Sequence, residues 1–407
     1  MKILDLLDSW SASGTDLNEF KEIIQNVANS TYTVQVDTNQ LTMMHFLGWN
    51  AKVEDRMNLS VHSEAQYLEG KIQKVALNIA KLKSNAKFIE EVTTVAPLMM
   101  NLNHAGYQKG DFYFTSGHLS RDLGARANLA GDAIYDATDD RDSYIMSRYV
   151  KKPETATAVI RYDDTNSIHK VFALASGNYC HIDQTILLDM IGRLEADLGK
   201  AECQAWKIDH FLTQIWLTFP ENADDICETY GLPDKFIPGV LLETSDSGDC
   251  SLRAVAYWQH SSSIRSRARI GLYERMHRGR FSSIDVLNTM PTKLMGKYME
   301  LPNRLAELLT IDIAEPDEVI AKILKMLNAD KLIGKKRTKN LCDCLCSEVG
   351  SRTTMTAYEL AVMFMDLPSR ISIDATCTES IENMAGRAPF VNFAKLAKST
   401  TTSVVVA

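Results

Sequence analysis

Arginines are concentrated in one short stretch of this chain. Residues 261–281, SSSIRSRARIGLYERMHRGRF, hold six arginines, and residues 253–280 hold seven against one acid, Glu274. This segment therefore has a net charge of +6 in a chain of formal net charge −8, so the remainder carries −14. A guanidinium pairs well with phosphate, and a basic strip on an acidic protein is typical of local contact with a polyanion.

The backbone conformation decides what the first three arginines can do. In an extended strand Arg265, Arg267 and Arg269 share one face, about 6.7 Å apart from a rise of about 3.3 Å per residue. That spacing is close to the step between phosphates of an extended single strand, so the guanidiniums could follow a nucleic-acid backbone. In a helix, Arg265 and Arg269 lie together and Arg267 lies nearly opposite. The alternative is a solvated segment that pairs with the acidic body of the same protein.

Two further features extend this candidate site. Tyr257, Trp258, Tyr273 and Phe281 flank the arginines and could stack on bases, although such rings are more often part of a core. A second basic cluster, GKKRTKN, is expected at a helix–loop junction, where the alternative is a solvated helix end stabilised by the C-terminal dipole. The candidate nucleic-acid-binding residues are Arg253, Arg265, Arg267, Arg269, Tyr273, Arg275, His277, Arg278, Arg280, Lys335, Lys336 and Arg337.

Metal and catalytic chemistry have weaker support. In CDCLC, a helix would turn Cys342 and Cys346 to one face and Cys344 away, and no second C-x-x-C pair completes a zinc site, so free thiols are favoured. Residues 132–142, DAIYDATDDRD, could hold Mg²⁺ in a nuclease that uses Asp139, but a solvated helix end is the better interpretation. His181 and Asp183 are two residues apart at a strand end, which favours a structural role.

No nucleotide-binding loop, dinucleotide-binding motif or hydrolase elbow is present in the sequence. We therefore predict no catalytic residue, no metal and no cofactor, and we favour a protein that is not an enzyme. The N-terminus MKILDLLDSW carries acids among its leucines, and no apolar run is long enough to span a bilayer. Together with eight scattered cysteines, these features predict a cytoplasmic protein with reduced thiols and no membrane contact.

The pattern along the chain predicts an α+β fold. Its central mixed or antiparallel β-sheet has packed helices, and its C-terminal part is mostly helical. Residues 31–49 alternate about DTNQ like a β-hairpin, and residues 63–92 have helical periodicity. Two β-rich runs in 155–183 flank the turn DDTNS, an amphipathic helix follows at 184–198, and three strand candidates follow within 205–260. The expected domains are a helical region with a hairpin (1–105), a central α+β domain (106–283), a helical region (284–395) and a frayed tail (396–407).

The central block resembles a phage- and plasmid-borne family catalogued as a domain of unknown function, number nine-three-two. The likeness covers roughly residues 110–395, and the family's first arginine is present as Arg161. The likeness continues through ASGNY at 175–179, Asp183 at a helix start, and the turn TSDSGD at 244–249. The family motif that follows this turn is eroded here to YWQHSSS, whereas a later one persists as His277, Arg278 and Gly279. TMTAYELAVMF and ENMAGRAPF resemble the family's C-terminal helix and its glycine-containing end.

This resemblance implies a phage, prophage or plasmid gene and an α+β fold, and it carries over no enzymatic activity. We expect a nucleic-acid-binding protein of DNA metabolism that prefers single-stranded DNA and forms a homo-oligomer. Kinship with single-strand annealing proteins is a hypothesis only. The alternative is a structural or interaction protein that modulates a host system, and a metal-dependent nuclease is the least favoured function.

Overall fold

The structure is a computed structural model of the 407-residue chain. It describes residues 6–37, 42–45, 87, 91, 98–101, 112–119, 155–163, 168–260, 266–370 and 378–401. The predicted helix at 63–92 lies outside these residues except at 87 and 91, and so do the acidic run 132–142, Arg265 and the end of the tail.

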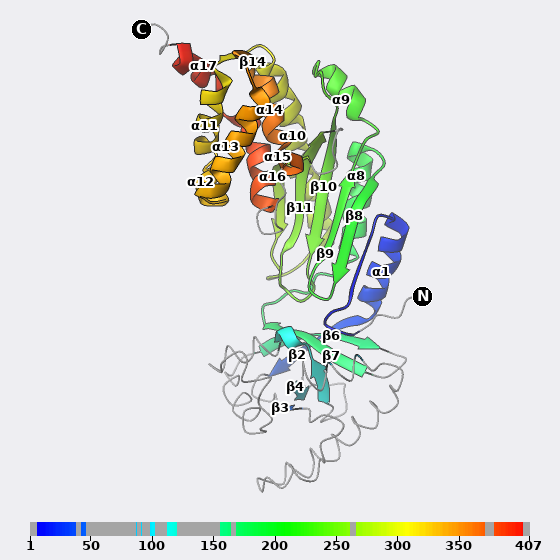
Figure 1. Cartoon of the computed structure of the whole chain (residues 1–407). Coiled ribbons are helices and arrows are strands. Elements are labelled where there is room, and N and C mark those ends of the chain that lie inside the picture. The colour runs from blue at the N-terminus through cyan, green and yellow to red at the C-terminus, as the bar shows by residue number, and fades with distance from the viewer. Residues whose placement is uncertain are drawn as a thin grey trace, which may run out of the picture.

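The first sheet, sheet 1, is antiparallel and has six strands in the order β1-β8-β9-β10-β11-β12. Five of them follow one another along the chain as a meander (Figure 1). The strands are β1 (Ser11–Gly14), β8 (Glu202–Asp209), β9 (Thr213–Thr218), β10 (Phe236–Thr244), β11 (Leu252–His260) and β12 (Arg267–Arg275). The short helix α9 (Ala223–Thr229) connects β9 to β10.

Sheet 2 lies at the lower end of the molecule in Figure 1 and has the order β2-β6-β7-β5-β4-β3. Its pairs are antiparallel except β5 with β7, which run parallel. The strands are β2 (Thr31–Asp37), β3 (Thr42–His45), β4 (Leu98–Asn101), β5 (Phe112–Thr115), β6 (Thr155–Asp163) and β7 (Ile168–Ser176).

The hairpin predicted at 31–49 is wrong in its pairing, although both strands exist. β2 pairs with β6, and β3 pairs with β4. Alternating side chains show that a segment can lie in a sheet, but they do not show which strand lies beside it. The predicted pairing of the two runs in 155–183 is confirmed, because β6 and β7 are antiparallel neighbours.

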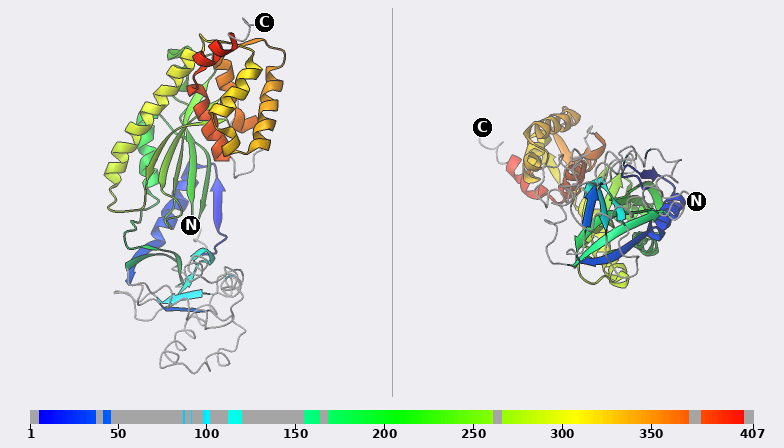
Figure 2. Two further views of the ribbon diagram at one scale, coloured as in Figure 1. Left: turned by 90° about the vertical axis from the view of Figure 1, so that its left-hand side faces the viewer. Right: turned by 90° about the horizontal axis from the view of Figure 1, so that it is seen from below.

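Two helices cover one face of sheet 1. α8 (Ile186–Leu198) and α10 (Ser283–Leu308) lie on the opposite side of the sheet from the C-terminal helices (Figure 2). Their buried side chains, such as Leu194 and Leu294, form one core with alternate residues of the sheet, such as Ala256 and Trp258. This burial is the main stabilising term for the fold. α1 (Leu17–Asn29) packs beside β8 through Phe20, whose ring is 6.1 Å from that of Trp206.

The C-terminal part is mostly helical, as the sequence predicts. After α10, the next helix has Pro316 at its start, and a later one begins with a capping box between Thr356 and Glu359. The elements are β13 (Asp312–Ala314), α11 (Pro316–Met326), α12 (Ala329–Leu332), α13 (Lys335–Val349), β14 (Thr354–Thr356), α14 (Ala357–Met365), α15 (Leu367–Arg370), α16 (Thr378–Arg387), η3 (Ala388–Phe390) and α17 (Phe393–Thr401).

The α+β class is confirmed, with its strands divided between two sheets. Among the described helices, none combines the length and the apolar character that a bilayer span requires. The division of the chain into domains stays a prediction.

Candidate functional site

The arginine segment is extended. β12 forms the edge of sheet 1, and its register sets Arg267 opposite Gln259 and Arg269 opposite Tyr257. Because side chains alternate along a strand, Arg267 and Arg269 share one face of the sheet. The extended alternative of the sequence analysis therefore holds for these two arginines, and the helical one is wrong.

Their guanidiniums are already engaged within the protein. Arg267 lies over the rings of Trp216 and Tyr257, at 5.5 and 5.7 Å from their centroids. Arg269 reaches across to α16, where its Nε donates to Glu382 at 2.6 Å and its Nη1 donates to Glu379 at 3.1 Å. The Arg269 side chain is only 14% exposed, so it holds α16 against the sheet instead of lining an open track.

Arg253 behaves in the same way on β11. It donates to Glu243 at 3.2 Å and to Glu274, across the strand pair, at 3.1 Å. The hydrogen bond from Arg253 lowers the pKa of the Glu274 carboxyl. Arg253 thus has acidic partners on both neighbouring strands. This agrees with the alternative in which the arginine segment pairs with acids of the same protein.

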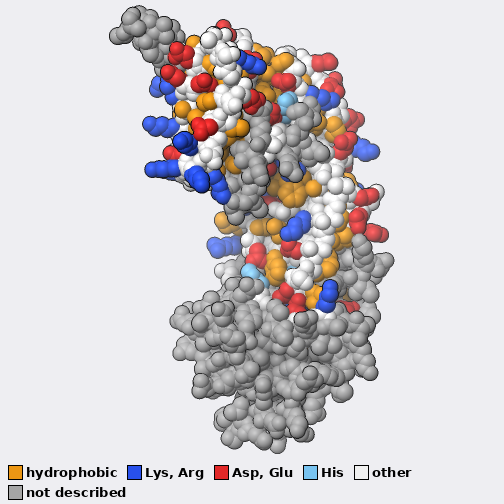
Figure 3. Space-filling model, in the orientation of Figure 1, with side chains coloured by type: hydrophobic (Ala, Val, Ile, Leu, Met, Phe, Trp, Pro, Cys, Tyr) orange, Lys and Arg blue, Asp and Glu red, His pale blue; other side chains and the backbone are white. Residues whose placement is uncertain are grey.

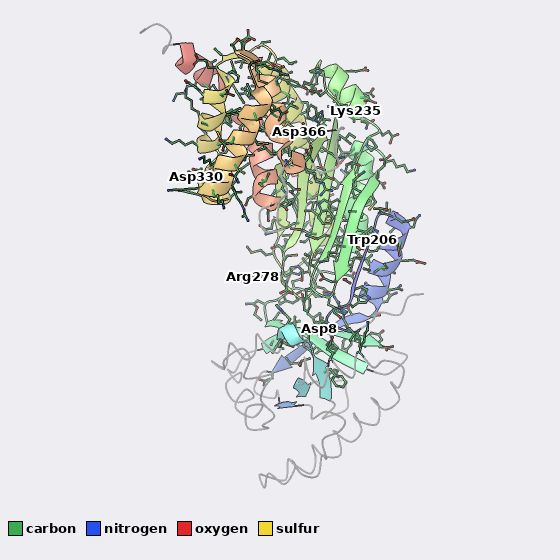
Figure 4. All side chains as sticks on the ribbon, in the orientation of Figure 1. Asp8, Trp206, Lys235, Arg278, Asp330 and Asp366 are labelled. Atoms are coloured by element: carbon green, nitrogen blue, oxygen red, sulfur yellow. The ribbon has the colours of Figure 1, made fainter. Side chains whose placement is uncertain are left out.

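The end of β12 differs from its beginning. Arg275 donates to the backbone carbonyls of Arg278 and Arg280, at 3.4 and 2.7 Å, and so supports the loop that follows the strand. Arg278 and Arg280 are exposed on that loop. Figure 4 shows Arg278 at the left-hand edge of the waist between the two sheets.

The neighbouring aromatic rings belong to the core. Tyr257, Trp258 and Tyr273 are 1%, 0% and 5% exposed. Tyr273 packs within the large core cluster, and its hydroxyl accepts from Thr289 at 3.4 Å. A ring buried in this way has no free face for a base, so we withdraw Tyr273 as a stacking residue.

The second basic cluster begins a helix. Lys335, Lys336 and Arg337 are exposed in the first turn of α13. The interpretation of these cations as a helix C-terminus stabilised by the dipole is therefore wrong. Positive charge at this end of a helix is unfavourable, because the dipole is positive there as well. An anion bound here would be stabilised both by the three cations and by the positive end of the helix dipole.

The residues that carry the family resemblance come together in space. ASGNY spans the end of β7 and the turn after it, TSDSGD joins β10 to β11, and His277–Gly279 follow β12. They meet around a pocket of about 540 Å³ between the two sheets. Backbone hydrogen bonds join the segments, from Cys180 to His277 at 3.0 Å and from Gly279 to Asn178 at 3.3 Å.

One wall of this pocket is an aromatic pair. The rings of Tyr179 and His277 are nearly parallel, with 5.4 Å between their centroids. The Tyr179 hydroxyl donates to the Asp246 carbonyl at 2.5 Å, and burial raises its pKa, so it remains a donor. Gly248, at φ +87°, packs by the Tyr179 ring, where an added Cβ would lie 3.1 Å from a ring carbon.

His277 is held in a defined orientation. Its Nδ1 lies 3.2 Å from the Cys180 carbonyl, which can only accept, so Nδ1 carries the proton. Only 7% of the residue is exposed, and burial lowers the pKa of the imidazole. At neutral pH the ring is therefore neutral.

Behind the pocket lies a buried ion pair. Arg161 from β6 donates through Nη2 to both carboxylate oxygens of Asp246, at 2.7 and 3.0 Å, and its Nη1 contacts Nδ1 of His210. Arg161 and Asp246 are 0% and 2% exposed. The sequence analysis named these two residues separately, in two motifs, and the pair between them joins sheet 2 to the β10–β11 turn.

A second buried cation was missed from the sequence. Lys170 on β7 is fully buried, lies 2.6 Å from Asp8, donates to the Leu6 carbonyl at 2.9 Å and contacts Glu91. Burial raises the pKa of Glu91 despite this neighbour. A single lysine inside the apolar run of β7 was the available signal, because a charge there must be paired.

The rim of the pocket carries charges of both signs. His118 lies 3.2 Å from Asp249, and both side chains are partly exposed. Arg253 and Arg278 also line it. Figure 3 shows histidine, basic and acidic side chains side by side at the waist where Figure 4 labels Arg278.

The cysteines of CDCLC lie on a helix. Cys342 and Cys346 are half-buried on α13, and Cys344 is exposed. Within the described ranges, no group of three histidine, cysteine or acidic residues is arranged to hold a metal ion.

No protein-family model, no curated protein and no solved structure matches this chain. The family resemblance of the central block accordingly stays a prediction.

Proposed function

We propose that the protein binds nucleic acid, single-stranded DNA in preference, through exposed cations at two places. The first is the loop after β12, with Arg278 and Arg280 supported by Arg275. The second is the first turn of α13, with Lys335, Lys336 and Arg337. We call these the β12 loop and the α13 turn.

The observation that carries this proposal is the contrast between engaged and exposed cations. Arg253 and Arg269 have acidic partners and are partly buried, whereas Arg278 and Arg280 of the β12 loop and Lys335 and Lys336 of the α13 turn are exposed. Figure 4 labels Arg278 and Asp330, which lies just before α13, on the same left-hand flank. In a chain of net charge −8, such a flank attracts a polyanion locally while the rest of the surface repels it.

Binding of this kind is electrostatic. Each single-strand phosphate contact contributes about 0.7 to the slope of log affinity against log salt concentration. The resemblance of residues 110–395 supports a phage or plasmid protein of DNA metabolism, acting in the cytoplasm of a bacterial host as a homo-oligomer. We assign no cofactor and no catalytic residue.

The test is fluorescence-anisotropy binding of a labelled single-stranded oligonucleotide across a salt series. Arg278→Gln with Arg280→Gln should reduce the slope by about 1.4 at most, and substitution of Lys335, Lys336 and Arg337 by Gln should reduce it by about 2.1 at most. A duplex of the same sequence measures the preference for single strands. Absence of binding at low salt would refute the proposal.

The matched control removes two cations elsewhere. Arg193 on α8 and Lys207 on β8 have side chains that are 47% and 53% exposed, each with an acid nearby. Arg193→Gln with Lys207→Gln changes the net charge by the same two units as the β12-loop variant, so it should leave the slope unchanged. An equal loss of slope would assign binding to net charge and not to the β12 loop.

A specific observation also favours the second function, a structural or interaction protein. Arg253, Arg267 and Arg269 all contact groups of their own chain. In this alternative the segment serves assembly only. Light scattering that gives a discrete homo-oligomer, together with no oligonucleotide binding, would support it over the first.

A further inference from the structure

The pocket between the two sheets has the composition of a site for a planar, anionic ligand. Its floor is the apolar run of β7 from Phe172 to Ala175, with Leu119 beside it. Its wall is the parallel pair of Tyr179 and His277. Its volume, about 540 Å³, lies within the range of small-molecule sites, so it takes one compact ligand and not a length of strand.

The polar groups of the pocket lie where they can orient such a ligand. Arg278 is exposed on the rim, next to the basic loop after β12. The Asp249 carboxylate accepts from Ser247 at 2.5 Å and can still accept from a ligand amino group, because a carboxylate has several lone pairs.

The backbone keeps this space open. Gly248 has a φ of +87°, which residues with a side chain rarely adopt, and the Cβ that it lacks would press on Tyr179. Ala173 and Ala175 are half-exposed on β7, whereas Phe172 and Leu174, which alternate with them along the strand, are buried. Small side chains therefore face the pocket from the floor, and larger ones would fill it.

We propose that this pocket binds one nucleotide unit, with its base against the Tyr179–His277 pair and the floor of β7 and its phosphate at Arg278. The inference rests on the proposed nucleic-acid binding, since the same loop supplies Arg278 to both sites. The unit is either a free nucleotide or one unstacked nucleotide of a bound strand. The two sources share the chemistry of a base and a phosphate.

The experiment is isothermal titration of the full chain with each of the four deoxynucleoside monophosphates and with inorganic phosphate. We expect one nucleotide per chain, and at least tenfold weaker binding of inorganic phosphate, which has no ring to pack. Ala173→Leu should weaken nucleotide binding at least tenfold by filling the floor. Ala205→Leu is the matched control, because Ala205 is also half-exposed on a strand, β8, but does not line the pocket.

A second pair of variants tests the wall independently of the floor. Tyr179→Phe keeps the ring and loses only the hydrogen bond to Asp246, so nucleotide binding should remain within about threefold of the wild type. Tyr179→Leu should lose at least tenfold. Thermal denaturation of each variant identifies any that fails to fold. Only variants that fold are used to decide whether the Tyr179 ring contributes to nucleotide binding.

The same titrations with a labelled oligonucleotide separate the two proposals. If Ala173→Leu weakens the oligonucleotide as well, the ligand is a unit of the strand; if it weakens only the monophosphates, the ligand is a free nucleotide. If the oligonucleotide binds and no monophosphate binds at millimolar concentration, the pocket proposal is overturned and the proposed function stands. If monophosphates bind and the oligonucleotide does not, the proposed function fails and the pocket proposal stands. Nucleotide binding unchanged by both Ala173→Leu and Tyr179→Leu would also overturn the pocket proposal.

Discussion

Gly386 and Gly296 are both helical, and we expect the same substitution to change stability in opposite directions at the two positions. Gly386 is buried in α16, where an added Cβ would lie 1.6 Å from the Arg269 carbonyl oxygen and 2.4 Å from its carbonyl carbon. Gly296 is exposed in α10. Apart from its two chain neighbours and the nearby backbone of its own helix, no atom lies within 4 Å of an added Cβ there.

The magnitudes follow from these distances. A Cβ does not approach backbone atoms closer than 3.0 Å, so Gly386→Ala must move α16 away from β12 by more than 1 Å. Overpacking of this kind costs about 3 kcal/mol at a site that cannot yield, and the better helix propensity of alanine returns about 1 kcal/mol at most. We therefore expect Gly386→Ala to lower the free energy of unfolding by about 2 kcal/mol. Gly296→Ala should raise it by about 0.5–1 kcal/mol.

Urea denaturation followed by far-UV circular dichroism measures both changes. Because α16 carries the acids that hold Arg269, Arg269→Ala should cost less in the Gly386→Ala background than in the wild type. If Gly386→Ala is as stable as Gly296→Ala, α16 does not dock on β12 as described. The explanation of why Arg269 is withdrawn from solvent would then fail.

Three further predictions concern stability. Asp246→Ala leaves Arg161 charged and buried, so it should lower the free energy of unfolding in urea by about 3–5 kcal/mol. Adding Arg161→Met should recover part of this loss, and a loss below about 1 kcal/mol would contradict the buried pair. Burial lowers the pKa of His277 in the folded state, so its contribution to stability is complete above about pH 6.5 and is lost as pH falls. His277→Gln should flatten that part of the stability–pH profile, and equal slopes for both proteins would contradict it. Thr356→Ala removes the cap of α14 and should cost about 1 kcal/mol by thermal denaturation, whereas Thr356→Ser should be nearly neutral, and equal costs would argue against the cap.

Much of the local structure was predictable from the sequence. The two β-rich runs in 155–183 predicted β6 and β7, and the amphipathic pattern of 184–198 predicted α8. The capping box at the start of α14 likewise involves two residues that are close in the sequence, Thr356 and Glu359. These signals are local, because the periodicity of buried side chains and the capping of a helix depend on residues a few positions apart.

The candidate site was predictable only in part. The sequence identified Arg161, Tyr179, Asp246 and His277 as members of separate motifs. It did not show that the segments carrying these motifs come together in the fold. Lys170 was missed because a lysine within a strand gives no indication of its partner. Asp8 lies far from it along the chain and reaches it only through the fold.

The sequence by itself determined the class of the fold, the edges of many elements and the concentration of seven arginines within residues 253–280 of an acidic chain. Only the tertiary structure decided what each arginine does. Arg269 lies against Glu382, which is 113 residues away, and is withdrawn from solvent, whereas Arg278 is exposed beside the pocket. The physical reason is that the role of a charged side chain depends on its partners and its burial, and contacts between residues far apart in the sequence determine both.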